Sequence, residues 1–294
     1  MTKYILRRVV LTVPVLFGVT LLVFSMLHLV PGDPVKAMFI ESGGASAEQI
    51  EHIRNLLGLN KPLPEQYWDY ITKALRGDLG ESIITKQKVL ELIVQNFPST
   101  LQLTVAGLGL AIVLGVVLGV VAAVRHNSWV DNAMMLIATL GVSMPSFWLG
   151  LLLILVFGIY LRWVPITAGS DLNRLALPAF ALGFQAAAII ARLVRSNLLE
   201  ALQEDYIRTA RAKGLSNRVV VLRHGLRNSL IPVTTVVGLQ FGGLLGGAVI
   251  IEAVFARQGI GQLLVGALQA RDFPLAQGCV LFIALVYVLV NLTV

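Results

Sequence analysis

The sequence from residue 205 to residue 216 reads Asp205-Tyr206-Ile207-Arg208-Thr209-Ala210-Arg211-Ala212-Lys213-Gly214-Leu215-Ser216. It is the one polar, helix-forming insert in the second half of a chain that is otherwise almost continuously apolar. It carries three basic side chains and two alanines. The order Gly214, Leu215, Ser216 then indicates a helix stop followed by a new N-cap. A short water-exposed helix between two membrane spans is a suitable docking site for another protein.

The composition is that of an integral membrane protein. Hydrophobic residues make up 56% of the 294 residues and charged residues only 13%, whereas about a quarter of a soluble protein is charged. The net charge of +7 comes from basic residues in short loops between apolar runs, as membrane orientation requires. This pattern does not indicate nucleic-acid binding. The single cysteine, Cys279, lies in an apolar run, so neither a disulfide nor a thiolate metal site is expected.

The amino-terminal part predicts a retained membrane anchor, residues 1–30. Its apolar run, residues 9–30, is about 33 Å long as a helix, which is enough to span a bilayer. The run ends in Pro31-Gly32-Asp33-Pro34 without a signal-peptide cleavage site. We therefore expect the amino terminus to lie in the cytosol.

Residues 31–98 contain seven Lys or Arg and nine Asp or Glu, which is too many charges for a membrane span. We expect this segment to form an extracytoplasmic subdomain between the first two spans. The spacing of its apolar residues predicts a short amphipathic helix over residues 47–57. Tyr67, Trp68 and Tyr70 are typical of an aromatic belt at the outer membrane interface.

The apolar runs predict a second span over residues 99–124, a third over 132–161 and a fourth over 175–191. The third run is thirty uncharged residues, about 45 Å as a straight helix, so Pro145 should kink or interrupt it. The fourth is short, and Arg192 and Arg195 would extend it by snorkelling. Residues 229–251 and 273–294 complete six spans.

Charge asymmetry sets the orientation. Residues 192–228 hold eight basic and three acidic side chains, so the positive-inside rule places this segment in the cytosol. With a cytosolic amino terminus, four spans must precede the segment. This count makes residues 132–161 a single kinked span.

The fifth span contains two overlapping pairs of small residues, which let helices approach closely. They are predicted to form the principal helix-packing face: Gly242, Gly243, Gly246 and Gly247. After Glu252, an apolar stripe from Ile260 to Leu268 predicts a re-entrant or interfacial helix. The sixth span stops at Val294 without a basic flank, so we expect the natural chain to continue or its end to be disordered.

The six predicted spans contain no Asp, Glu, Lys or Arg, whereas a proton-coupled carrier usually needs a titrating group inside the membrane. We find no catalytic motif and no metal-binding motif. If this chain moves a solute uphill, the energy must therefore enter from another polypeptide. A self-contained channel or secondary carrier is the alternative, and a membrane-embedded enzyme has no catalytic constellation to support it.

Short motifs along the whole chain resemble the permeases of ATP-binding cassette (ABC) importers, specifically the dipeptide and oligopeptide branch. Residues 206–216, with the downstream His224, Leu226, Arg227, Asn228 and Pro232, resemble the EAA loop of that family. Further resemblances are Tyr4-Ile5-Leu6-Arg7-Arg8, Pro31-Gly32-Asp33-Pro34, Gly77-Asp78-Leu79-Gly80 with Ser82, Pro98-Ser99-Thr100, Ser143-x-Pro145-x-Phe147-Trp148-x-Gly150, Leu177-Pro178-Ala179, Glu252-Ala253-Val254-Phe255 and Arg271-Asp272-Phe273-Pro274.

The chain also departs from the general pattern of the family. Arg208 occupies the position of the first glutamate of the EAA pattern, and Thr209 stands where an alanine is expected. The peptide branch as a whole looks like this. Near residue 257, Arg257-Gln258-Gly259 replaces the more usual x-Pro-Gly.

The resemblance implies an all-α membrane protein with the six-helix fold of a type I importer permease. Residues 99–294 would be a five-helix core with a cytosolic coupling loop at 192–228. The implied partners are a second homologous permease subunit, two cytosolic ATPase subunits that bind ATP and Mg²⁺, an extracytoplasmic binding protein and the lipid bilayer of a bacterial or archaeal cell membrane. The resemblance assigns ATPase coupling to residues 205–215, with Tyr206, Ile207, Ala210 and Gly214 as a low-relief docking face. Short peptides are the default cargo, and related permeases carry glutathione, nickel chelates or sugars.

Overall fold

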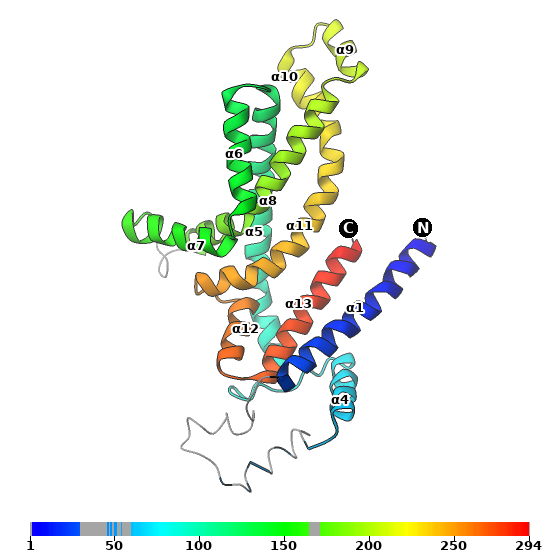
Figure 1. Ribbon diagram of the computed structural model, residues 1–294, viewed down its shortest axis with the longest axis vertical. Coiled ribbons are helices and arrows are strands. Elements are labelled where there is room, and N and C mark those ends of the chain that lie inside the picture. Colours follow the sequence, from blue (N-terminus) through cyan, green and yellow to red (C-terminus); the bar gives the residue numbers. More distant parts are fainter. Residues whose placement is uncertain are drawn as a thin grey trace. The chain divides into compact units, whose positions relative to one another are not determined.

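The computed structural model is almost entirely helical (Figure 1). It describes residues 2–29, 46, 48, 50, 51, 54, 60–164 and 171–293, so the helix predicted over residues 47–57 lies largely outside the described part. In chain order the helices are α1 (Thr2–Leu29), α4 (Leu63–Leu75), α5 (Val89–Val124), α6 (Trp129–Ser143), α7 (Ser146–Leu153), η1 (Ile154–Tyr160), α8 (Asp171–Ala201), α9 (Asp205–Ala212), α10 (Asn217–Val219), η2 (Val220–Gly225), α11 (Leu226–Val254), α12 (Ile260–Gln269) and α13 (Phe273–Thr293).

Five helices in the described part of the chain are long and apolar enough to cross a membrane, and the bent pair of α6 with α7–η1 raises the count to six. The predicted six spans agree with this count when the bent pair is taken as one span, and several helices extend beyond the predicted boundaries. Helix α5 begins at Val89 and contains Pro98, and α8 continues to Ala201. The helices consequently include charged residues that the shorter predicted spans left out, among them Arg195 and Glu252.

The predicted interruption at Pro145 is confirmed. Helix α6 ends at Ser143, and Pro145 precedes the first residue of α7. The two helical segments meet at an angle of 107°. Proline has no backbone N–H to donate and its ring clashes with the preceding turn, so the helix cannot pass straight through this position. Of the two predicted outcomes, a kink or an interruption, the structure shows the interruption.

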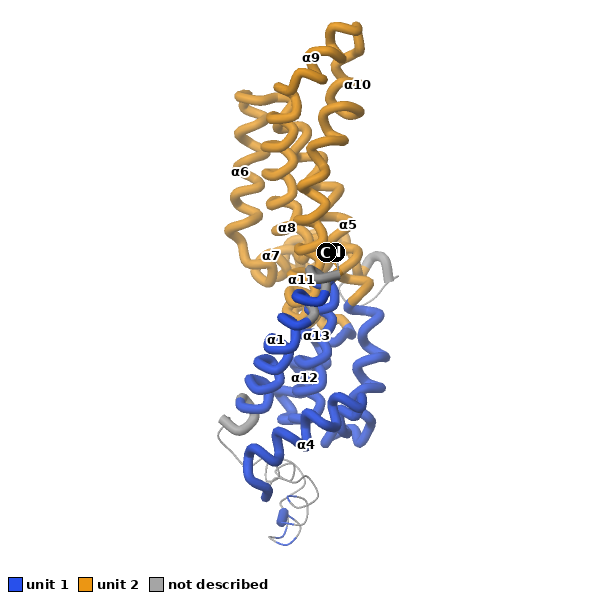
Figure 2. Tube along the Cα trace, turned by 90° about the vertical axis from the view of Figure 1, so that its right-hand side faces the viewer, with its two compact units in different colours: residues 1–100, 258–292 blue, residues 101–257, 293–294 orange. Residues whose placement is uncertain are grey.

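The chain divides into two compact units (Figure 2). Unit 1 comprises residues 1–100 and 258–292, and unit 2 comprises residues 101–257 with the last two residues. Helix α5 contributes to both units. The division into anchor, external subdomain and five-helix core that we predict from the sequence is a functional one, and it stays a prediction.

Unit 2 is organised around α8. This helix contacts α6, α7 and α11, and 67% of its apolar stretch is buried, compared with 18–28% for the other four long helices. Its alanines and branched residues form the centre of one core cluster, including Ala181, Ala187, Ile190 and Val194. The outer helices therefore keep most of their apolar surface for lipid or for other chains.

Glycines allow α5 to lie directly against α8. A Cβ on Gly119 would come within 2.6 Å of the carbonyl oxygen of Ala191, and one on Gly115 within 2.6 Å of Ile190. A Cβ on Gly183 would overlap the backbone carbonyl of Gly107. Small residues at a helix interface permit this close approach, which is the main source of packing energy between helices in a membrane.

Unit 1 joins residues that are distant in the sequence. The buried carboxylate of Asp272 accepts hydrogen bonds from the Ser82 hydroxyl and from the backbone N–H of Ile83, the latter at 3.1 Å. The Thr100 hydroxyl oxygen accepts a hydrogen bond of 2.9 Å from the backbone N–H of Ile260, which fixes the start of α12. Several of the short motifs noted in the sequence thus have a structural role, namely holding the ends of α5, α12 and α13 together.

Within unit 1, α4 packs against α1 through aromatic side chains. The Tyr67 ring lies 5.8 Å from Phe17 and 5.3 Å from Phe24, and the hydroxyl groups of Tyr67 and Thr20 are 2.9 Å apart. Burial raises the pKa of Tyr70 to about 12. Of the three aromatic residues predicted to form an interfacial belt, only Trp68 is strongly exposed.

We expect the substitution Gly183→Ala to destabilise the protein. The new methyl group would meet backbone atoms of Gly107, which cannot rotate away, so α5 and α8 would have to separate. Overpacking of this kind costs about 1–3 kcal/mol of unfolding free energy. The measurement is chemical unfolding of the detergent-purified chain, with Gly109→Ala on the exposed side of α5 as the matched control, since nothing lies within 4 Å of its added methyl group. Equal effects of the two substitutions would contradict the proposed contact.

Candidate functional site

The candidate site is α9, the helix formed by the polar insert that we single out in the sequence. Asp205 lies in its first turn and Arg211 in its last, and both charges complement the helix dipole. The Thr209 hydroxyl donates a hydrogen bond of 3.0 Å to the carbonyl of Asp205. An exposed ion pair joins Arg208 to Asp205 at 3.3 Å. The predicted helix is therefore present, with a favourable charge at each end.

The predicted stop at Gly214 is also present. Lys213 is the C-cap residue, and Gly214 adopts φ of +77°, a left-handed conformation that glycine tolerates best. The Gly214 N–H donates to the carbonyl of Arg211 at 2.9 Å. Ser216 occupies the N-cap position of α10, but its side chain makes no capping hydrogen bond. The chain thus turns sharply after α9 and returns toward α11.

Helix α9 has an inner and an outer face. Ile207 and Ala210 are only 0% and 6% exposed, and they pack against Val220 and Leu202 of the same chain. This corrects the predicted docking face, because Ile207 and Ala210 are already used inside the chain. The outer face consists of the side chains that remain exposed, namely Asp205, Tyr206, Arg208, Thr209, Arg211, Ala212 and Lys213, and exposed Gly214 and Leu215 follow it.

Helix α9 packs on η2, a π-helical segment that directly precedes α11. Val220 of η2 contacts the inner face of α9, and the next residue, Val221, packs against Leu198 of α8 and Ala123 of α5. Gly225 keeps η2 close to α8, since an added Cβ would lie 3.0 Å from Leu198 and 3.2 Å from Leu202. Helix α9 is therefore connected by continuous packing to the ends of α5 and α8.

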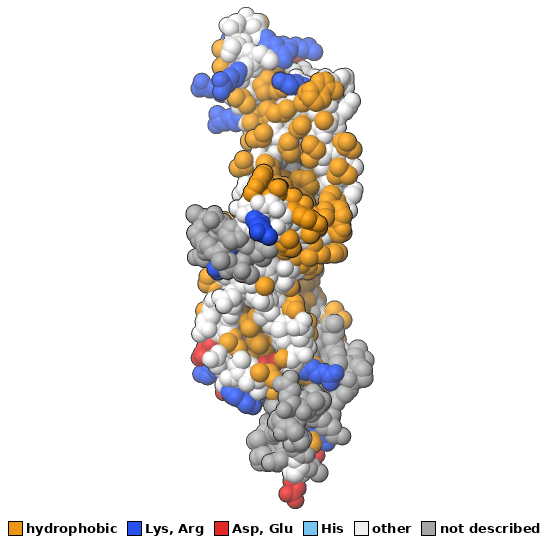
Figure 3. Space-filling view, turned by 90° about the vertical axis from the view of Figure 1, so that its left-hand side faces the viewer, with side chains coloured by type: hydrophobic (Ala, Val, Ile, Leu, Met, Phe, Trp, Pro, Cys, Tyr) orange, Lys and Arg blue, Asp and Glu red, His pale blue; other side chains and the backbone are white. Residues whose placement is uncertain are grey.

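The surface around α9 is basic. Besides Arg208, Arg211 and Lys213, the segment that follows exposes Arg218, Arg223 and Arg227. Figure 3 shows Lys and Arg side chains gathered at this end of unit 2, with many apolar side chains on the surface below them. The arrangement suits a partner with acidic groups or an anionic lipid surface.

The glycines predicted as the principal packing face behave differently from one another. A Cβ on Gly247 would meet Leu182 at 3.1 Å, whereas one on Gly243 or Gly246 would have nothing within 4 Å. Gly242 is buried. The closest glycine approaches in unit 2 instead involve α5 and α8. The role of these four glycines as the principal packing face stays a prediction.

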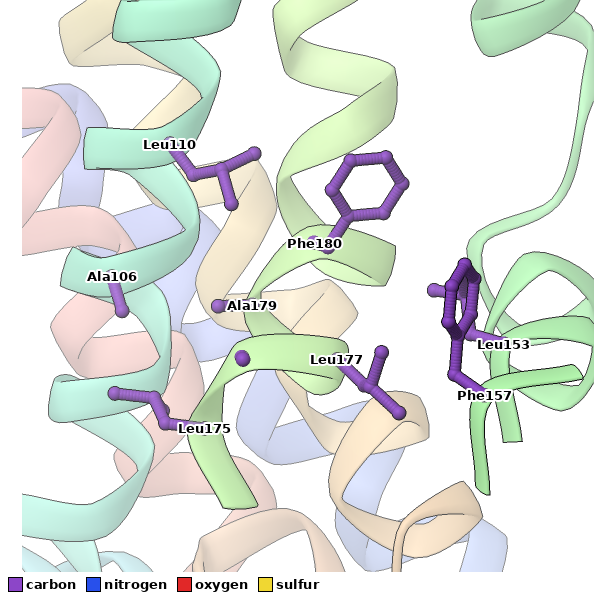
Figure 4. Close-up of a pocket in the computed structure, with 9 residues that line it drawn as sticks. Ala106, Leu110, Leu153, Phe157, Leu175, Leu177, Ala179 and Phe180 are labelled. Carbon is purple, nitrogen blue, oxygen red and sulfur yellow. The ribbon is translucent and has the colours of Figure 1, made fainter. Parts of the chain in front are cut away.

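An apolar crevice of about 460 Å³ lies in unit 2 between α5, α8 and the α7–η1 segment (Figure 4). Its lining contains only alanine, leucine and phenylalanine side chains: Ala106, Leu110, Leu153, Phe157, Leu175, Ala176, Leu177, Ala179 and Phe180. These side chains offer no hydrogen-bonding group to a polar solute. Unit 1 has a second crevice of about 420 Å³, which polar side chains including Asn96, Gln258 and Gln262 help to line.

The sequence also suggests Phe147, Trp148, Gln185 and Gln240 as polar or aromatic candidates for the pathway, with packing as the simpler role. None of them lines either crevice. Gln185 donates to the carbonyl of Val142 at 3.5 Å, and Phe147 and Trp148 are partly exposed.

One ionic contact is missing from the prediction. Arg195, expected to snorkel, instead donates from its Nε and Nη2 atoms to the Asp131 carboxylate at 2.6 and 2.7 Å. No local pattern pairs the two residues, because the pairing depends on how α6 packs against α8.

Comparison with known proteins agrees with this architecture. Residues 115–294 match the family described as binding-protein-dependent transport system inner membrane component, and residues 1–104 match the corresponding amino-terminal family. A chain in a crystal structure described as an amino acid ABC transporter with histidines aligns with a TM-score of 0.53 at 16% identity, over 69% of this chain and 89% of that one. At this identity the likeness concerns the fold alone.

Relatives with high sequence similarity cover the whole chain. The glutathione transport system permease proteins GsiC of Escherichia coli strain K12 and of Shigella dysenteriae are each 44% identical over 294 residues, which is 100% of this chain and 95% of theirs. The GsiC protein of Pectobacterium atrosepticum is similar to the same extent. The chain therefore belongs to the family of inner membrane components of binding-protein-dependent transport systems, as a multi-pass ABC importer permease.

Proposed function

We propose that this chain forms half of the translocation pathway of an ATP-driven importer, and that α9 is the element through which the ATPase drives it. The single observation that carries the proposal is the division of α9 into a buried inner face and an exposed, basic outer face. Helix α9 packs on the chain through its inner face alone and lies at the end of a bundle of membrane helices. Its outer face is therefore available to bind an ATPase subunit. ATP and Mg²⁺ would be bound by the ATPase subunits, and this chain would hydrolyse nothing.

The packing under α9 suggests how movement is transmitted. Ile207 contacts Val220 and Leu202, and the neighbouring Val221 contacts Leu198 and Ala123. A displacement of α9 would therefore move the ends of α8 and α5 with it. Closure of the ATPase subunits around ATP would shift the permease between inward-open and outward-open states, because each state presents α9 in a different position.

The charge distribution supports a cytosolic position for α9. The exposed basic side chains around α9 follow the positive-inside rule. With four spans before this segment, the amino terminus would also be cytosolic. The proposed assembly contains a second permease, two ATPase subunits and an extracytoplasmic binding protein.

For cargo, we propose short peptides, with glutathione as the first candidate. Glutathione is itself a tripeptide, and the relatives with 44% identity are named glutathione permeases. The apolar crevice in unit 2 has no side chain that could recognise peptide polar groups. We propose that selectivity lies largely in the binding protein.

The outer face of α9 can be tested with Arg208→Glu. Arg208 is exposed, so its substitution leaves the inner packing intact, whereas a change at Ala210 would disturb it. We expect ATPase binding and uptake in proteoliposomes to fall about tenfold or more, since like charges brought together at an interface cost several kcal/mol and 1.4 kcal/mol is tenfold. Arg76→Glu, at the exposed C-cap of α4, is the matched control. Wild-type binding and uptake in both variants would rule out α9 as the coupling surface.

Uptake measurements also test the cargo and the class of transporter. Proteoliposomes containing the complete importer should accumulate labelled glutathione only with ATP, and unlabelled dipeptides should compete to the extent that the binding protein accepts them. Accumulation of an unrelated solute, with no competition by peptides, would contradict the proposed cargo. Solute flux through this chain alone, without ATPase subunits, would instead indicate a channel or secondary carrier.

A further inference from the structure

A buried carboxylate organises the turn between α5 and α6. Asp131 is 2% exposed and lies in the first turn of α6. Its Oδ2 atom accepts a hydrogen bond of 3.1 Å from the backbone N–H of Asn127, a residue with φ of +59°. The Ser128 side chain caps α6 by accepting from the Asp131 N–H. The carboxylate therefore holds the turn in a conformation that an unsupported chain would adopt less readily.

Arg195 of α8 binds this carboxylate with two nitrogen atoms. Its Nε lies 2.6 Å from Oδ1 and its Nη2 lies 2.7 Å from Oδ2, a two-pronged geometry that fixes orientation as well as distance. The Arg195 side chain is itself only 25% exposed. The pair is thus more sheltered from water and salt than an ordinary surface ion pair.

His126 contacts both Asp131 and Arg195 and leaves the ion pair between them intact. Its Nδ1 atom is 3.2 Å from Asp131 Oδ2 and 3.2 Å from Arg195 Nη2. One ring nitrogen can donate to the carboxylate or accept from the guanidinium, but not both at once. The contact between Asp131 and Arg195 is therefore the constant link between α6 and α8.

Arg195 lies on the same side of α8 as the residues that pack against η2 and α9. Arg195, Leu198 and Leu202 are spaced at i, i+3 and i+7, which places them on one side of the helical path. Leu198 packs against Val221 of η2, and Leu202 packs against the inner face of α9. One side of α8 and the turn that follows it thus bind α6, η2 and α9 in succession.

Further along α6, a glycine allows close contact with α8. A Cβ on Gly141 would lie 2.9 Å from the Ala188 side chain. Gly141 is ten residues beyond Asp131, or about 15 Å along the helix. Close packing at Gly141 and the ion pair at Asp131 therefore hold α6 against α8 at two well-separated points.

We propose that the ion pair between Asp131 and Arg195 is a positioning contact that makes α6 move with α8 when α9 is displaced. Through the break at Pro145, α6 leads into α7, whose Gly150 lies against Phe255. The pair would thus extend the movement of the coupling helix to a part of the bundle that α9 does not touch. This inference rests on the proposed function of α9.

Coupling can be measured with Asp131→Asn, which keeps the shape of the side chain and removes its charge. In the complete importer, we expect ATP hydrolysis to continue while the ATP consumed per solute transported rises about tenfold, within the range of ordinary coupling effects between sites. Arg195→Lys keeps the charge but loses the two-pronged geometry, so it should give an intermediate ratio. Asp69→Asn removes the exposed ion pair with Lys61 in α4 and is the matched control. An unchanged ratio in both Asp131→Asn and Arg195→Lys would overturn the proposal.

A distance measurement separates positioning from simple stability. Spin labels at Trp129 and Ser196, both exposed, report the separation of α6 and α8, and the native Cys279 is fully buried and should not be labelled. We expect the wild-type distance to stay the same with and without ATP in the importer. In Asp131→Asn it should change with ATP, and it should also broaden in the isolated chain. A wild-type distance that shifts with ATP, or an unaltered distribution in the variant, would overturn the proposal.

The two hypotheses fail in different ways. If the wild-type importer does not couple ATP hydrolysis to uptake, the proposed function fails, whatever the variants do. The label distances in the isolated chain still report whether the ion pair holds α6 to α8. If the wild type transports normally and neither Asp131→Asn nor Arg195→Lys uses more ATP per solute, the function stands and the positioning role of the pair is refuted.

Discussion

The close approach of α5 and α8 is the contact on which unit 2 depends. Side chains larger than hydrogen at Gly115, Gly119 or Gly183 would meet atoms of the opposing helix. Because lipid is as apolar as leucine, burial alone does not drive helices together in a membrane, and dispersion contacts at short range must do so. With α5 held against it, α8 becomes the most buried helix of the described part, and α6, α7 and α11 pack around it.

This central position would let α8 transmit movement under the proposed function. It is the helix that leads directly into α9, and its last turns carry the side chains that contact η2. A force applied to α9 therefore enters the best-packed helix of the unit and not a peripheral one. The outer helices keep most of their apolar surface exposed, and this surface is available for lipid or for other chains.

The sequence predicted the elements whose signals are local. Residues 205–214 predict a short helix that ends at a glycine, and Pro145 predicts a break. The lengths of the apolar runs, together with the charge asymmetry of residues 192–228, predict six spans. Contacts between residues distant in the sequence could not be predicted in this way. The inner face of α9 could not be recognised from Ile207 and Ala210 alone, because burial there depends on Val220 and Leu202 returning beneath the helix. The glycines that pack most closely were likewise not those of α11. Their spacing shows that one helix face carries small residues, but it does not show which helix lies opposite.

The π-helical segment η2 has a consequence for how such a protein can change over time. A π turn holds one more residue than an α turn, so the loss of one residue from the segment Val220–Gly225 would convert it to ordinary helix. Because the π turn takes up the extra residue, the parts of the chain on either side would keep nearly the same rotation about the helix axis. This segment can therefore gain or lose one residue without turning the basic face of α9 in another direction. The same change of length in a straight α-helix would rotate that face by about 100°.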